Sequence, residues 1–438
     1  MFLTLEDPRA RVKGSRDPLG VQPIWWTFGR RVIGNLTTQT DSCRGFAVLL
    51  LGRYFAQRLL EAGEIKEEDT LGVFLRFEQV CGYARHFVRD ADDPEDATER
   101  ILGFERISRR SNEKQVAINS SGESAILSDQ KAYGLWGLFS VSARASKLLP
   151  YGPVGVTEAA AGFIKEHYLP QLDVRVLDSL KDLIREGGEL RLKPPSNIVN
   201  DLGQALKGRL SAAEQAFFRE HLCEARHNDN MPPGLQAGFC DLLERHTDLQ
   251  RGINRQELTR IQKDADGENP ELAKRIGHIL TLEALLAPCD VIFGLLRARH
   301  GQSPERVAEQ LRNDWGDDGP PHLPSGKFEE VLPRTAEVAG SEVEGHMRGA
   351  HQALSQGDYE SAIREMLQWN EHIMTNRNAA PWIRIDEEDG TLDVRYRGPE
   401  QRLPRRTELD SLWRYSYFIN ALKALLAQTS DPPAGARS

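Results

Sequence analysis

The chain has 438 residues, of which 39% are hydrophobic and 28% charged, and its formal net charge is −9. This length allows two or three domains with substantial hydrophobic cores, and the composition is that of an ordinary soluble globular protein. The negative net charge excludes a general attraction to phosphate. Any contact with nucleic acid therefore requires a local group of basic side chains.

The 5 cysteines and the N-terminus favour a cytoplasmic protein. No two cysteines form a C-x-x-C pair, and an odd, scattered set is typical of buried free thiols in a reducing compartment. The first residues lack an apolar segment long enough for a signal peptide, and the longest apolar run, Phe46 to Leu51, is far shorter than the roughly 20 residues that span a bilayer. We therefore expect no membrane segment. The cysteines are Cys43, Cys81, Cys223, Cys240 and Cys289.

Residues 1–127 are predicted to form an N-terminal helical domain. The turn Asp17-Pro18-Leu19-Gly20 opens it, and a polar run over 35–42 is rich in residues that cap helices. The run from Gly45 to Phe55 predicts a helix buried on most sides, and a second helical stripe follows it, so we expect an antiparallel pair. One short strand is predicted at Val116 to Ile118 within a polar loop.

Residues 128–170 allow two interpretations. A helix from Ser128 to Leu149, a Gly/Pro turn and the segment from Val154 to Phe163 resemble the end of a winged-helix module, in which a helix leads into a small wing. In that case Arg144 and Lys147 lie on the helix that approaches a nucleic-acid groove. The other interpretation is a plain helical hairpin.

Residues 171–316 are predicted to form a helical domain, because apolar residues at helical spacing alternate with capping residues and Pro or Gly breaks. One segment of this succession, residues 189–193, is short and is stopped by Pro194-Pro195. The segment from Asp317 to Gly326 is dense in glycine and proline, which indicates a linker at the end of this domain.

Residues 327–428 are predicted to form a C-terminal helical domain with a small β-hairpin. A helical pair covers 334–376. Apolar residues alternate on both sides of Asp389-Gly390 between residues 381 and 396, which predicts two strands joined by a turn. Residues 429–438 are predicted to form a disordered tail.

Sequence motifs that would fix a reaction are lacking. The chain contains no G-x-x-x-x-G-K-[ST], no G-x-S-x-G, and no G-x-G-x-x-G after a strand. His346 and His351 are five residues apart, a spacing that places the two imidazoles far apart around a helix. Glu189 and Lys193 are too far apart for the carboxylate–lysine pair of a nuclease strand. We therefore predict no metal site and no cofactor.

Four arginines near the N-terminus have two possible roles. Arg30, Arg31, Arg44 and Arg53 could converge on a phosphate, because arginine offers a planar fork of donors. They could instead form structural ion pairs with the many carboxylates. Arg44 and Arg53 are nine residues apart on the predicted helix and do not share a face.

Residues near both ends of the chain carry a resemblance to a known group of proteins. They are Asp17-Pro18-Leu19-Gly20 and Arg44-Gly45-Phe46 near the start, and Ala380-Pro381-Trp382-Ile383, Trp413 and Tyr417-Phe418 near the end. In this layout the chain resembles uncharacterised bacterial proteins found in antiphage-defence gene clusters. The resemblance implies a bacterial cytoplasmic protein that works beside other subunits. It implies no catalytic residue, because that group has no assigned activity.

The sequence as a whole predicts a mainly α-helical protein: a multi-helix bundle with a small C-terminal β-hairpin and, in one interpretation, a winged-helix module. The first functional hypothesis is a non-enzymatic binding subunit of a bacterial antiphage assembly that contacts a partner protein and DNA. Arg30, Arg31, Arg144 and Lys147 are the residues predicted to bind nucleic acid. The alternative is a metal-dependent nuclease or other hydrolase whose carboxylate site is assembled only by the fold.

Overall fold

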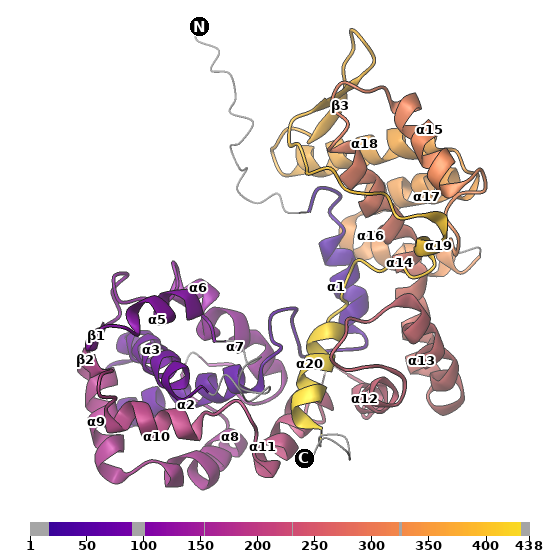
Figure 1. Ribbon diagram of the computed structural model, residues 1–438. Helices are drawn as coiled ribbons and strands as arrows, with labels where there is room; N and C mark the ends of the chain where they lie inside the picture. Colours follow the sequence, from indigo (N-terminus) through magenta and orange to yellow (C-terminus); the bar gives the residue numbers. More distant parts are fainter. Residues whose placement is uncertain (1–16, 90–100, 153, 230, 324–325, 431–438) are drawn as a thin grey trace, which may run out of the picture. The chain divides into compact units, whose positions relative to one another are not determined.

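The computed structural model describes residues 17–430 apart from 90–100, 153, 230 and 324–325. The chain divides into two compact units, each made of two separate stretches. Unit 1 comprises Met1–Val32 with Gly252–Tyr417, and unit 2 comprises Ile33–Arg251 with Phe418–Ser438 (Figure 1). The predicted tail lies outside the described residues from residue 431 onward.

The described residues confirm the mainly α-helical, multi-helix fold (Figure 1). Strands occur there only as two small antiparallel pairs, one in each unit. The unit boundaries near residues 32 and 251 differ from the predicted domain ends. The segment 128–170 lies wholly inside unit 2, and the predicted linker at 317–326 lies inside unit 1.

The long helix α14 (Pro270–Leu296) is the centre of unit 1. It contacts α1 (Gln22–Arg30), α13 (Arg255–Glu268), α16 (Phe328–Ala339) and α18 (Tyr359–Asn376), among others. A helix that is apolar on all sides must be covered on all sides. By length and composition alone α14 could cross a membrane, and 89% of its most apolar window is buried inside the protein. The other elements of unit 1 are α15 (Pro304–Trp315), α17 (Ser341–Ser355), β3 (Ile383–Ile385), β4 (Leu392–Val394) and α19 (Arg406–Leu409).

The predicted β-hairpin is confirmed. β3 and β4 pair antiparallel, with Ile383 opposite Val394 and Ile385 opposite Leu392. Gly390 in the turn has φ of 72°, in the left-handed region that glycine adopts without strain. The predicted helical pair over 334–376 is also confirmed, because α17 packs against α18.

The helix α2 (Cys43–Glu61) is the centre of unit 2 and is buried on most of its surface, as predicted. The hydroxyl of Ser42 caps it by accepting a hydrogen bond from the Gly45 backbone amide at 2.9 Å. α2 packs against α3 (Thr70–Val88), α7 (Leu135–Ala145) and α9 (Val174–Glu186). The shorter helices of unit 2 are η1 (Glu67–Asp69), α5 (Phe104–Arg110), α6 (Gln130–Tyr133), α8 (Glu158–Phe163), η2 (Ile164–Tyr168), η3 (Leu169–Gln171), α10 (Asn197–Ala205), α11 (Ala212–Phe218), η4 (Arg219–Cys223), α12 (Leu235–His246) and α20 (Ile419–Thr429).

The small sheet of unit 2 corrects one prediction. β1 (Gln115–Ile118) agrees with the predicted strand and pairs antiparallel with β2 (Gly188–Arg191). The segment at 189–193 therefore begins as a strand and is not part of the helical succession. Its length is too short for a helical period to show, and its pairing partner lies far away in the sequence.

Residues 128–170 correct the winged-helix interpretation. Their described part forms α6, α7, α8, η2 and the start of η3, and it contains no strand. A wing is a β-hairpin, so this segment lacks the element that defines the module. The plain helical interpretation describes it better.

Candidate functional site

A group of basic side chains, which we call the Arg31 cluster, lies in unit 1 where three helices meet. Arg31 directly follows the last residue of α1, Lys274, Arg275 and His278 belong to α14, and Arg334 belongs to α16. The spacing of three and four residues places the α14 members on one face of that helix. The helices α1, α14 and α16 contact one another, so the fold assembles this group from three distant segments.

Hydrogen bonds fix the centre of the Arg31 cluster. Arg31 Nη1 donates to His278 Nδ1 at 3.0 Å, and Arg275 Nη1 donates to the backbone oxygen of Arg31 at 2.6 Å. Because a guanidinium can only donate, His278 Nδ1 must accept, which leaves a neutral imidazole with its proton on Nε2. Burial, then the charges of Arg31 and Lys274, lower the pKa of His278, in agreement with this state.

The Arg31 cluster carries an excess of positive charge. The pKa of Arg31 is lowered first by burial and then by the charges of Arg334 and Arg275. Two carboxylates offset part of this charge: Glu271 raises the pKa of Arg31, and Glu330 raises that of His278. The four cations of the cluster still outnumber these two anions. A bound anion would reduce the repulsion among these cations, and guanidinium groups match the geometry of a phosphate.

The structure separates the four residues that the sequence selected for nucleic-acid binding. Arg30 and Arg31 belong to unit 1, whereas Arg144 and Lys147 belong to unit 2. Arg30 ends α1, burial lowers its pKa, and it has interaction partners of its own. The fold places Arg31 near Lys274, Arg275 and Arg334, and it places Arg144 near Arg53 in unit 2.

Lys147 occupies an unusual backbone position at the end of α7. Its φ of 56° lies in the left-handed region, where a helix C-terminus usually has glycine. The Leu148 amide donates to the Ala143 carbonyl at 2.8 Å, which closes the helix end. The Lys147 ammonium then pairs with Asp229 at 2.6 Å. The turn therefore directs this cation towards the loop that follows η4.

A continuous column of five rings runs through the neighbouring part of unit 2. The ring centroids are 4.5 Å apart for His167 and Phe163, 3.9 Å for Phe163 and Phe217, and 4.6 Å for Phe217 and His221. His227 extends the column at 4.7 Å from His221. The two phenylalanines stack face to face, with 1° between their planes.

Two copies of one local pattern build this column. The pattern [ST]-x5-F-x2-E-H occurs over residues 157–167 and again over residues 211–221. In each copy the first hydroxyl caps a helix, and in each copy that helix ends in a π-helical turn, η2 or η4. Such turns are rare and occur often at functional sites. The sequence analysis missed this repeat, although the pattern is visible in the sequence.

The second copy brings together a possible ligand set, which we call the metal triad: Glu220, His221 and His227. One ligand atom from each lies within 4.8 Å of the other two. His227 Nε2 is 2.9 Å from Glu220 Oε1, and His221 Nδ1 is 3.1 Å from the Ser146 carbonyl oxygen at the end of α7. His221 is buried, and burial lowers its pKa.

Two buried amides hold the metal triad's helix in place. The last carbonyls of a helix have no partner within the helix. Asn35 Nδ2 donates to the carbonyls of His221 and Leu222 at 3.2 and 2.9 Å, and Gln236 Nε2 donates to those of Leu222 and Cys223 at 3.2 and 2.8 Å. Asn35 is fully buried, so this support comes from inside unit 2.

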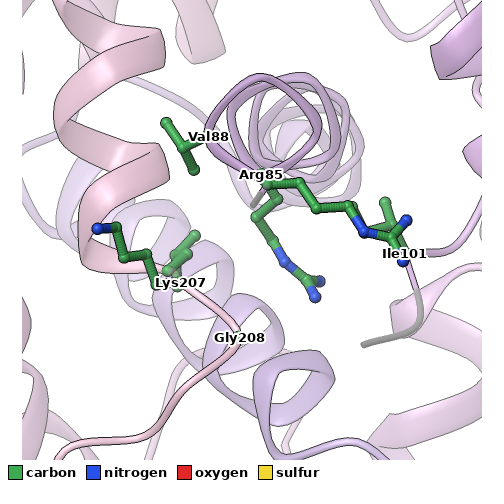
Figure 2. Close-up of a pocket in the computed structure, with 7 residues that line it drawn as sticks. Arg85, Val88, Ile101, Lys207 and Gly208 are labelled. Atoms are coloured by element: carbon green, nitrogen blue, oxygen red, sulfur yellow. The ribbon is translucent and has the colours of Figure 1, made fainter. Parts of the chain in front are cut away.

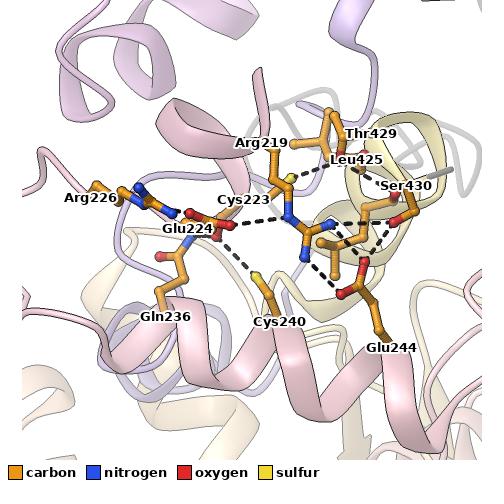
Figure 3. A network of polar contacts seen from close by, with 11 residues as sticks. Arg219, Cys223, Glu224, Arg226, Gln236, Cys240, Glu244, Leu425, Thr429 and Ser430 are labelled. Atoms are coloured by element: carbon orange, nitrogen blue, oxygen red, sulfur yellow. Dashed lines mark hydrogen bonds and ion pairs between the residues drawn. The ribbon is translucent and has the colours of Figure 1, made fainter. Parts of the chain in front are cut away.

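An ion-pair network fixes the start of η4 (Figure 3). Arg219 Nη2 lies 2.7 Å from Glu244 of α12, and Arg219 Nε lies 3.1 Å from Glu224. The Ser430 hydroxyl donates to Glu244 at 2.6 Å. The hydrogen bond that Arg219 donates to Glu244 raises the pKa of Arg219, which therefore stays charged. Both ends of η4 are thus anchored.

A small basic pocket lies beside α3 in unit 2 (Figure 2). Arg85, Arg89 and Lys207 are its charged lining residues, and no carboxylate belongs to the lining. Arg85 and Arg89 already have interaction partners, so they do not form a set of free cations.

The other residues weighed from the sequence have structural contacts. Arg44 forms a buried ion pair with Glu214, which agrees with the structural interpretation. The guanidinium of Arg53 lies over the Trp136 ring at 3.2 Å, and burial lowers its pKa to about 9. His351 stacks on Phe328.

Two further histidines pair with acids in unit 1. His346 Nδ1 lies 2.5 Å from Glu365 Oε1, and His372 Nδ1 lies 2.8 Å from Glu342 Oε2. His346 and His351 have different partners, as expected from a spacing that sets the two imidazoles far apart around the helix. All five cysteines are free and buried, as predicted.

The fold thus provides one basic cluster in unit 1 and one histidine–carboxylate group in unit 2, beside the end of α7 that carries Lys147. No protein-family model, curated protein or solved structure matches the chain.

Proposed function

We propose that this protein is a binding subunit that contacts nucleic acid through phosphate groups, and that it works beside partner proteins in a bacterial antiphage assembly. The Arg31 cluster carries the nucleic-acid part of the proposal. Among the described residues, the side chains of its members Lys274 and Arg334 form no hydrogen bond or ion pair. Lys274 is exposed and Arg334 half-buried, so both are placed to neutralise an incoming phosphate.

Exposed apolar side chains of unit 2 support contact with a partner protein. Tyr133 and Val141 are each 60% exposed, and Tyr151 is 76% exposed. They belong to α6, α7 and the loop after α7, close in sequence to Arg144 and Lys147. Aromatic residues and arginine are enriched in the centre of protein interfaces. The assembly itself is proposed from the resemblance of the chain's two ends to antiphage-defence proteins.

Neutralising single members of the Arg31 cluster tests the phosphate contact. Lys274→Gln and Arg334→Gln should each weaken binding to a duplex of mixed sequence, and each should reduce the slope of log K against log salt by about 1, because one fewer counterion is released. The measurement is fluorescence anisotropy over a salt series. Lys263→Gln, an exposed lysine of α13 in the same unit, is the matched control and should leave the slope unchanged. Equal slopes in all four proteins would contradict the proposal.

A second candidate function is a metal-dependent nuclease or hydrolase. The observation in its favour is the metal triad, because two imidazoles and a carboxylate are the ligand set of several catalytic zinc sites. That function predicts nicking of supercoiled plasmid that stops when a chelator is added and that is lost in Glu220→Gln. If the protein binds the plasmid but leaves it intact when divalent metal is added, the result favours the binding function.

A further inference from the structure

We propose that Glu220, His221 and His227 form a site for a divalent transition metal ion, with Zn²⁺ as the best match. The proposal does not depend on nucleic-acid binding, since the Arg31 cluster belongs to the other unit. Its first basis is the ligand geometry: one carboxylate and two imidazoles with ligand atoms within 4.8 Å of one another. Around a tetrahedral ion with bonds of about 2.0–2.1 Å, ligand atoms lie roughly 3.4 Å apart. The Glu220–His227 pair, at 2.9 Å, would therefore open slightly, and His221 would move closer to them.

The protonation state of His221 fits a ligand. A backbone carbonyl can only accept, so His221 Nδ1, at 3.1 Å from Ser146 O, must carry the proton. In the neutral imidazole that binds a metal ion, the lone pair is then on Nε2. A metal-binding histidine commonly donates its other N–H to a backbone carbonyl in this way, which fixes the ring and its tautomer. The Phe217 ring also packs against the His221 ring, with centroids 4.6 Å apart and 46° between the planes.

The ligands also differ in exposure in a way that suits metal uptake. His221 is buried and is held by the anchored η4 turn, whereas Glu220 and His227 have side chains that are 44% and 46% exposed. The hydrogen bond between Glu220 and His227 at 2.9 Å joins the two groups that an ion would bridge. The ion would take the place of the proton shared in this hydrogen bond. The exposed side of the site would leave room for water or for a ligand from a partner.

The choice of metal follows from the ligands. Imidazole nitrogen is a poor ligand for Mg²⁺ and Ca²⁺, which prefer sets made of oxygen alone. Imidazole with carboxylate is typical of zinc and its transition-metal neighbours, and three protein ligands are typical of zinc sites with an open position. The site would therefore discriminate against Mg²⁺.

The first copy of the repeated pattern provides an internal control. Glu166 and His167 occupy the equivalent positions of η2, and the centroids of the His167 and Phe163 rings lie 4.5 Å apart. This copy does not contribute a group of three ligands within the described residues. The two copies thus share a fold and differ in the third ligand, His227.

Titration with Zn²⁺ alone tests the proposal. The full-length protein, stripped with chelator, should bind one Zn²⁺ per chain at micromolar or tighter concentration by calorimetry. Glu220→Gln and His227→Gln should each weaken that site at least tenfold, while Glu166→Gln and His167→Gln should leave it unchanged. Both test positions are partly exposed, so the variants should fold, and unchanged circular dichroism checks this. With Co²⁺ the unmodified protein should show the intense visible bands of four-coordination, and His227→Gln should lose them. Wild-type protein without such a site, or equal affinity in both pairs of variants, would overturn the proposal.

Discussion

Arg44→Met is expected to destabilise unit 2 by about 3–5 kcal/mol, because it leaves the carboxylate of Glu214 buried without its cation. In the intact protein Arg44 Nη2 also donates to the Arg209 carbonyl at 2.8 Å, and the Tyr168 hydroxyl donates to Glu214 at 2.5 Å. Burial acts to raise the pKa of Glu214, but Arg44 and the other donors lower it further, so the carboxylate is charged. Far-ultraviolet circular dichroism during urea unfolding measures the loss.

Two controls separate the lost charge pair from lost packing. Adding Glu214→Gln to Arg44→Met removes the unpaired charge, and its amide can still accept from the Ser211 backbone amide and donate to the Tyr168 hydroxyl oxygen. This double variant should recover more than half of the lost stability. In Arg44→Met alone the pKa of Glu214 should rise through burial, so the loss should be smaller at pH 5 than at pH 8. If the double variant lost as much stability as Arg44→Met, and if the loss in Arg44→Met were the same at pH 5 and pH 8, then lost packing and not lost charge would dominate.

Glu283→Gln is expected to stabilise unit 1 at pH 8 by as much as about 3 kcal/mol. Burial raises the pKa of Glu283 from 4.5 to about 7, and each pKa unit corresponds to about 1.4 kcal/mol. Above pH 7 the folded protein therefore bears a buried carboxylate. Between pH 4.5 and 7 the folded state binds more protons than the unfolded state, so the contribution of this group to stability falls as pH rises. Below about pH 4.5 the advantage of the variant should vanish.

Geometry predicts that glutamine fits at position 283 and not at position 78. Glu283 Oε1 accepts from the Arg414 and Tyr415 backbone amides, and Oε2 accepts from the Tyr417 hydroxyl at 2.9 Å, so an amide NH₂ could donate to that hydroxyl oxygen. Glu78 shows the same rise of its pKa to about 7 through burial. Its Oε1 accepts from the Leu135 amide and its Oε2 from Gln130 Nε2, both at 2.7 Å, so an NH₂ there would face a donor.

Glu78→Gln should therefore destabilise unit 2 by about 1–3 kcal/mol, the cost of a buried polar group without a partner. Gln130 is not free to turn, since its Oε1 accepts from Gln79 Nε2 at 3.2 Å and from the Ile126 amide at 3.3 Å. Tryptophan fluorescence follows unit 1, which holds all tryptophans of the chain except Trp136, and circular dichroism follows both units. Stabilisation at both positions would contradict the hydrogen-bond argument.

Local signals in the sequence predicted much of the fold. The polar run over 35–42, rich in capping residues, gave a correct helix start, because Ser42 caps α2 and capping depends on residues only three apart. The prediction of the C-terminal hairpin from its Asp-Gly turn was also correct, because a turn likewise depends on residues close together in the sequence. The strand β2 was missed because its partner β1 lies about seventy residues earlier, a pairing that no local pattern reveals.

The candidate sites were less predictable than the helices. Arg31 was selected from the sequence, but its neighbours Arg275 and Arg334 come from helices more than two hundred residues away and meet it only in the folded unit. Arg30 was selected with it, yet adjacent helical residues point in directions about 100° apart. His221 could have been found, because the E-H pair recurs with the same cap and phenylalanine spacing. Its third partner His227 follows the end of the helix, where helical spacing gives no guide.

The salt dependence of duplex binding by the unmodified protein tests the central claim most directly. Arg275 is already paired with Glu271 at 2.6 Å, so Lys274, Arg334 and Arg31 should neutralise two or three phosphates, which predicts a slope of log K against log salt of about −2 to −3. A slope near zero between 50 and 200 mM salt, or no binding to DNA or RNA duplex at 50 mM, would contradict the account.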